Sequence, residues 1–144
     1  MVKANGKSYE QIITIEANPA KGFTTQSLDL LYKQGMRLHG LQEQLAILVD
    51  TLNSTITTLT KTAATDTAAK TAKLKTLDAF KHEILELNRK SIFFDEFKFR
   101  RKVSDLYFAV ATSIEPLSAS QEKGIGLLEE EYTKFKSRFY AMIK

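Results

Sequence analysis

One long stripe of leucine and isoleucine residues constrains the fold of this chain more than any other feature. Between residues 25 and 61, apolar side chains recur at steps of three, four or seven, at Leu31, Leu38, Leu41, Leu45, Leu48, Leu52, Ile56 and Leu59. Such spacing places them on one face of an α-helix, as in the seam of a helical bundle. The pattern predicts a helix from Thr25 to Lys61 that is roughly 55 Å long, at about 1.5 Å per residue.

Three shorter stripes with helical spacing follow this one. The second is expected to end at about Arg89, and the third at Glu115-Pro116, because proline cannot continue the hydrogen-bond ladder. The fourth begins at about Ala119, where Ser118 and Gln121 have the S-x-x-Q spacing of a capping box. Two segments between the stripes lack this periodicity: residues 62–71 are small and Thr-rich and are expected to form a turn, and residues 91–102 are irregular.

Four amphipathic helices can bury their apolar faces only against one another. The chain has 144 residues, of which 43% are apolar and 26% charged, and its net charge is +4, values typical of one soluble domain with one core. Short connections favour helices that alternate in direction. The expected fold is therefore an all-α, antiparallel four-helix bundle with up-down-up-down topology over residues 21–144.

The first 20 residues have a different character. Asn5-Gly6 is a favoured two-residue hairpin turn, and the segment Tyr9 to Ile15 is rich in strand formers. Only the second half of a hairpin is evident, and an isolated strand needs a partner. Residues 1–20 are thus interpreted as a β remnant and linker, and the whole chain as a module cut from a larger protein with a preceding β domain.

The composition argues against several other classes of protein. No stretch approaches the roughly 20 apolar residues of a membrane span, so none is predicted. The chain has no cysteine, which excludes disulfides and thiolate metal sites.

Candidate catalytic and metal-binding groups have simpler explanations. His82, Glu83 and Glu86 resemble a helical metal motif, but a second histidine is missing where Glu86 stands. The acidic run at residues 129–131 points in three directions, because successive helical residues are about 100° apart, and it is interpreted as a solvated face. Neither a nucleophile triad nor a phosphate-binding glycine loop is present. We therefore expect a non-enzymatic chain with no metal, no cofactor and no small-molecule ligand.

Aromatic and basic residues interleave between residues 89 and 102. The residues singled out as an interaction patch are Phe93, Phe94, Phe97, Phe99, Arg100, Arg101 and Lys102. Such a mixture can bind single-stranded nucleic acid, with basic groups on phosphates and aromatic rings on bases. The favoured interpretation is structural, with the phenylalanines closing the end of the bundle and the charges in water, because excess charge outside the patch is close to zero. A docking surface for a neighbouring domain is intermediate between the two.

Two segments resemble a known family. The segment GKSYEQIITIEANP, residues 6–19, looks like a closing β strand with its Pro-containing exit, and the segment from Leu106-Tyr107 through Pro116-Leu117-Ser118 to Gln121 looks like a Leu-Tyr helix followed by the start of a final charged helix. Both resemble the C-terminal helical region of bacterial, Bacteroidetes-type proteins with sortilin-like (VPS10-type) BNR-repeat β-propellers, which are described as glycosyl-hydrolase-like. The chain departs from the family where Asn18-Pro19-Ala20 replaces Asp-Pro-Arg, and in its Thr-rich residues 51–71.

The resemblance implies a non-catalytic role. The propeller that would carry any activity lies outside this chain, so no catalytic residue can be carried over. The implied parent is exported, with a periplasmic or cell-surface location. The expected function is a structural or docking helical domain whose partners are neighbouring domains of the parent or a second copy. The alternative is a ligand-sensing or single-stranded nucleic-acid-binding bundle.

Overall fold

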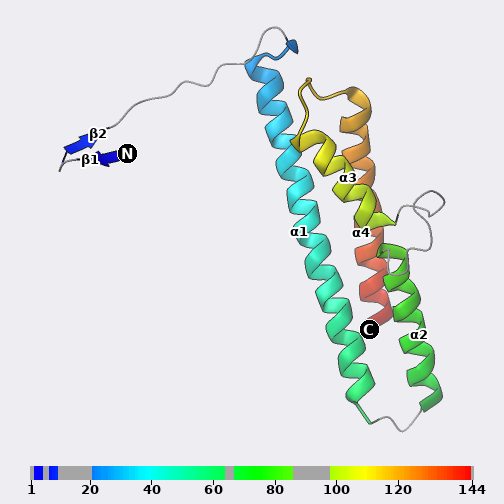
Figure 1. Cartoon of the computed structure of the whole chain (residues 1–144). Coiled ribbons are helices and arrows are strands. Elements are labelled where there is room, and N and C mark those ends of the chain that lie inside the picture. Colours follow the sequence, from blue (N-terminus) through cyan, green and yellow to red (C-terminus); the bar gives the residue numbers. More distant parts are fainter. Residues whose placement is uncertain (1, 5–6, 10–20, 64–66, 86–97, 144) are drawn as a thin grey trace, which may run out of the picture.

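The computed structural model describes residues 2–4, 7–9, 21–63, 67–85 and 98–143. Four helices dominate the described part, and the all-α four-helix bundle is confirmed (Figure 1). The elements in chain order are β1 (Val2–Ala4), β2 (Lys7–Tyr9), α1 (Thr25–Lys61), α2 (Thr67–Ile84), α3 (Phe99–Ala111) and α4 (Ala119–Ile143).

The N-terminal β structure is a two-stranded hairpin. β1 pairs with β2 in antiparallel register, with Val2 opposite Tyr9 and Ala4 opposite Lys7. The two strands therefore flank Asn5-Gly6, the residues expected to form the turn. The expectation that the chain holds only the second half of a hairpin is wrong, because β1 supplies the first half. Residues 10–15 of the predicted strand lie outside the described residues.

α1 has the predicted bounds. Thr24 caps its first turn, since the Thr24 hydroxyl accepts a hydrogen bond from the Ser27 amide at 3.1 Å and the Ser27 hydroxyl accepts one from the Thr24 amide at 2.8 Å. The leucine stripe faces the core, where Leu38, Leu41, Leu45, Leu48 and Leu52 are buried.

The direction of the helices differs from the predicted alternation. Lys70, near the start of α2, reaches the last turn of α1, whereas Val110, near the end of α3, lies beside Gly35 in the first half of α1. α2 and α3 thus both run antiparallel to α1, one after the other along its length (Figure 1). α4 runs parallel to α1, because Arg37 meets Glu129 and Gln44 meets Tyr132 further along both helices.

Helix lengths explain this correction to the up-down-up-down topology. α2 has 18 residues and α3 has 13, so each can cover only part of the 37-residue α1, and in series they cover one side of it. The four helices consequently pack as three rods that lie side by side: α1, α4, and α2 followed end to end by α3.

Two predicted boundaries also shift. α2 begins at Thr67 within the predicted turn, because alanine-rich residues 67–72 favour helix even without large apolar side chains. α3 begins at Phe99, the first residue of the third predicted apolar stripe, and Phe99 is part of the core. α3 ends at Ala111, where Ser113 makes local hydrogen bonds with Glu115 in place of helical ones. α2 ends at Ile84, and residues 86–89 of its predicted end lie outside the described residues.

The start of α4 is confirmed. The Ser118 hydroxyl accepts a hydrogen bond from the Gln121 amide at 3.2 Å, and the Gln121 side chain accepts one from the Ser118 amide at 2.9 Å. This is the capping box predicted from the S-x-x-Q spacing.

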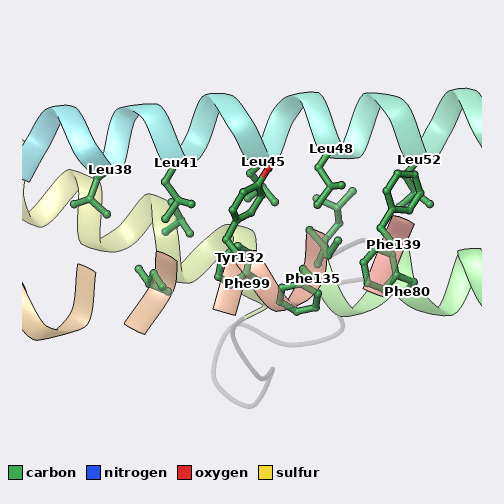
Figure 2. Packing of buried hydrophobic residues seen from close by; sticks show 14 of the residues in the cluster. Leu38, Leu41, Leu45, Leu48, Leu52, Phe80, Phe99, Tyr132, Phe135 and Phe139 are labelled. Carbon is green, nitrogen blue, oxygen red and sulfur yellow. The ribbon is translucent and has the colours of Figure 1, made fainter. Parts of the chain in front are cut away.

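Aromatic rings join α4 to α2 and α3 in the core. Phe80 of α2 lies between Phe135 and Phe139 of α4, with ring centroids 5.8 and 6.1 Å apart, and Phe99 of α3 contacts Phe135 at 5.1 Å (Figure 2). The α1 leucines pack over these rings. One core therefore runs the length of the bundle and holds the helices in fixed positions.

Candidate functional site

The structure places Phe99, one member of the predicted interaction patch, inside the core. Only 1% of Phe99 is exposed, and its ring packs on Phe135. This agrees with the structural interpretation of Phe99. The ring packs beside the middle of α1, however, and not at the end of the bundle (Figure 2). Phe93, Phe94 and Phe97 lie outside the described residues.

The basic members of the patch point in different directions around α3. The Arg101 guanidinium pairs with Asp105 at 3.1 Å, and the Lys102 ammonium pairs with Glu131 of α4 at 3.6 Å. Arg100 is exposed and faces the side of α1. The structure therefore does not bring Arg100, Arg101 and Lys102 together into one basic surface.

The candidate metal motif is divided between different partners. The His82 ring lies 3.7 Å from Asp78, one turn earlier on α2. Glu83 accepts two hydrogen bonds from Arg138 of α4, at 2.8 and 3.1 Å, and Arg138 thereby holds the pKa of Glu83 below its usual value. Glu86 lies outside the described residues, and within the described ranges no group of three or more His, Cys, Asp or Glu side chains could hold a metal ion.

The acidic run on α4 likewise serves two separate ion pairs. Glu129 pairs with Arg37 of α1, while Glu131 pairs with Lys102 of α3. Glu130 between them is exposed. The three carboxylates do not converge on a common point, as their spacing predicted.

The feature that does gather side chains is an apolar groove between α1 and α3, with a volume of about 410 Å³. Its walls come from the first three turns of α1 and the last two turns of α3, namely Leu28, Leu31, Tyr32, Gly35, Met36, Tyr107, Val110 and Ala111. Gly35 keeps the groove deep, because a side chain there would approach the Val110 methyl group on the opposite wall. The groove is open and almost entirely apolar.

Exposed apolar side chains gather at the end of the bundle that holds this groove. Tyr32 is 70% exposed and Met36 49% on the α1 wall, and Phe108, next to Tyr107 on α3, is 67% exposed. Leu30 and Ile114 are also exposed at this end of the bundle. Eight large apolar side chains are exposed in the described part, and five of them lie where α1 begins and α3 ends. Such a concentration of exposed apolar side chains is typical of an interaction surface.

A second hollow of about 390 Å³ continues along the same seam toward α2. Its walls are more polar and include Gln42 and Asp50 of α1 together with Arg100 and Ser104 of α3. Because both hollows are formed by α1 and α3, we call the whole surface, including Tyr32, Met36 and Phe108, the α1–α3 face. This face is on the side of α1 and α3 that does not contact α4.

No family model, curated protein or solved structure matches this chain. None of the helices among the described residues is sufficiently long and apolar to cross a membrane.

The sequence prediction missed this face although a signal for it was present. Tyr32 and Met36 lie on α1 before its buried leucines, which begin at Leu38, and Phe108 lies outside the buried stripe of α3. Apolar residues off the core stripe of an amphipathic helix indicate a second apolar surface. The predicted interaction patch contained none of these three residues.

Proposed function

We propose that this chain is a non-catalytic helical bundle that docks onto protein through its α1–α3 face. The observation that supports the proposal most directly is the apolar groove, whose walls include the exposed Tyr32 and Met36, together with the exposed Phe108 next to its wall residue Tyr107 on α3. Burying an exposed aromatic or methionine side chain is favourable by roughly 1.5–3 kcal/mol, and such residues dominate binding energies at protein interfaces.

The rest of the described structure is consistent with a structural role. Ion pairs Arg37–Glu129 and Arg138–Glu83 join α4 to α1 and α2, and the capping residues fix the helix ends. These contacts make the bundle a rigid support. A rigid support keeps the groove in its binding shape, which lowers the entropic cost of docking.

We further propose that the bundle is the C-terminal module of a larger, exported β-propeller protein. The resemblance of residues 6–19 and 106–121 to the helical region of that family supports this proposal. So does the β hairpin that precedes α1, because a two-stranded hairpin is marginal on its own and is stabilised by further strands. In such a parent, the bundle would position or pair the propeller domains.

The anionic fluorescent dye bis-ANS, whose emission rises when it binds apolar surface, tests the docking face in the full chain. We expect the native protein to bind the dye and the double variant Tyr32→Ser, Phe108→Ser to lose most of the fluorescence. The matched control is Leu127→Ser, Tyr140→Ser, which removes two exposed apolar side chains from α4 (54% and 46% exposed) and should leave the signal unchanged.

Circular dichroism at each step would verify that all variants remain folded. Absence of dye binding by the native chain, or an equal loss in the control variant, would refute the proposal that the α1–α3 face is a binding surface.

A further inference from the structure

The two hollows of the α1–α3 face lie in one line along the bundle. On α1, wall residues of the two hollows recur at steps of three, four or seven, namely Leu28, Tyr32, Gly35, Gln42, Ala46 and Val49. On α3, they recur at steps of three or four, namely Arg100, Ser104, Tyr107 and Ala111. Residues at such steps share one side of a helix, so both walls face the same seam along its whole length.

An α-helix fits this seam better than a β-strand does. The seam extends about 32 Å from Leu28 to Val49, at about 1.5 Å per residue, which is the length of a helix of about 20 residues. Both walls are helices, whose backbone groups are already hydrogen-bonded within each helix, so a bound strand would find no edge to pair with. A bound helix satisfies its own backbone and can place side chains between those of the two walls.

The chemical character of the seam changes from one end to the other. The groove between the first turns of α1 and the last turns of α3 is apolar, whereas the second hollow has Asp50 on its α1 wall and Arg100 on its α3 wall. Both of these residues are exposed, and neither forms an ion pair with another of the described residues. The next two basic residues of α3, Arg101 and Lys102, are already paired. Arg100 is thus available to a carboxylate from outside the chain.

We propose that the α1–α3 face binds an amphipathic helix of another protein, about 20 residues long, as a further rod beside α1 and α3. The inference rests on the proposed docking function and names the class of partner. One half of the bound helix carries apolar side chains at steps of three and four, which fill the apolar groove beside Tyr32. The other half carries an acidic side chain toward Arg100 and a basic one toward Asp50. Apolar anchors supply most of the affinity of such a contact, and complementary charges fix its register.

A labelled designed peptide of about 20 residues, added to the full chain, tests this inference by fluorescence anisotropy. Leucines occupy one face of its first three turns, and a glutamate and a lysine flank the same face near its end. The same sequence in reverse is the second probe, because a helix can enter the seam in either direction. We expect one of the two peptides to bind with a dissociation constant on the order of 10⁻⁵ M, and to gain helical circular dichroism on binding. Replacing its leucines with serines should abolish binding.

Charge reversal separates the proposed contact from general electrostatic attraction. Arg100→Glu should weaken binding about fivefold to tenfold, since it removes one attraction and adds one repulsion at an exposed site. A peptide with lysine in place of its glutamate should recover the native affinity toward this variant. The matched control is Lys136→Glu, which makes the same charge change at an exposed site on α4 and should leave binding unchanged.

The outcomes separate this inference from the proposed function. No binding of either peptide up to about 500 μM, or equal weakening by Arg100→Glu and Lys136→Glu, would overturn the helix inference. If bis-ANS binding still depends on Tyr32 and Phe108 in that case, the docking face stands and its partner is not a helix of this kind. A second copy of the chain in that place would be detected as a dimer by sedimentation velocity. If neither peptide nor dye binds, both proposals fail.

Discussion

At the scale of single residues, Arg138 shows how an exposed ion pair can be tied to the core. Its guanidinium donates two hydrogen bonds to Glu83 and lies over the Phe80 and Phe135 rings, 5.4 and 5.9 Å from their centroids. The hydrogen bonds lower the pKa of Glu83, against the opposing effect of burial. A carboxylate with a lowered pKa stabilises the fold above its unfolded pKa, about 4.3, and this stability is lost as the pH falls through the folded pKa.

We therefore expect Glu83→Gln to reduce the free energy of unfolding at pH 7 by less than about 1 kcal/mol, because the pair is largely exposed. The difference from the native chain should shrink as the pH falls below about 4. Urea unfolding at pH 7 and pH 3 measures both values, and a difference that is the same at both pH values would contradict the assignment.

Tyr132 is the second residue with a distinct prediction. It is 7% exposed, and its hydroxyl donates a hydrogen bond to the Gln44 carbonyl at 3.2 Å. Burial, and to a lesser extent Tyr140, raises the pKa of Tyr132. A raised pKa means that the contribution to stability is present below the unfolded value of about 10 and is lost as the pH rises above it.

Tyr132→Phe should cost about 0.5–1.5 kcal/mol at pH 7 by removing this hydrogen bond. It should also remove part of the loss of stability in alkali. Thermal unfolding of both proteins at pH 7 and pH 10.5 provides the comparison; a steeper alkaline loss in the variant than in the native chain would be inconsistent with a buried, neutral Tyr132.

At the scale of elements, the end of α1 depends on a side chain of α2. The Lys70 ammonium donates hydrogen bonds to the Thr60 and Thr62 carbonyls at 3.0 and 2.7 Å. These carbonyls belong to the last turn, where the helix provides no partner and the helix dipole favours a positive charge.

Lys70→Met should therefore destabilise the fold by about 0.3–1 kcal/mol and increase amide exchange in the last turn of α1. The nearby Lys75, which is exposed and makes no such contact with α1, supplies the control Lys75→Met. Similar exchange in both variants would mean that Lys70 does not act as a cap.

Helix positions in this chain were more predictable than helix directions. The bounds of α1 and the start of α4 follow from the leucine stripe and from capping residues Thr24, Ser118 and Gln121, which act within one or two turns. That α2 and α3 run in series does not follow from local patterns. It depends on how two short helices share one side of α1, which is a property of packing between elements.

At the scale of the whole molecule, the functional surface was less predictable than the core. The aromatic and basic composition of residues 93–102 pointed to Phe99, which packing places in the interior, and to two basic residues that are already paired: Arg101 with Asp105 of its own helix, and Lys102 with Glu131 of α4. The α1–α3 face emerges only when Phe108 and Tyr32, 76 positions apart in sequence, are brought to the same end of the bundle. The composition of one segment cannot indicate that two residues far apart in the sequence lie at the same end of the bundle.

The proposed larger parent predicts unequal stability along the chain. An isolated hairpin is marginal in water, whereas the bundle shares one core. Amides of β1 and β2 should exchange within seconds while those of the α1 and α4 cores are protected for far longer. Hydrogen exchange measured on the monomer tests this, and protection of the hairpin equal to that of the helices would favour a self-contained domain over a module of a larger β protein.

In the proposed function, the α1–α3 face is uncovered in the isolated folded chain and is buried on docking. Hydroxyl-radical footprinting measures this directly, because methionine and aromatic side chains report their own exposure. In dilute protein, Tyr32, Met36 and Phe108 should react readily and Phe139, which is 0% exposed, should not. If Tyr32 and Phe108 were as unreactive as Phe139, the chain would cover this face itself, and the proposed docking surface would be ruled out.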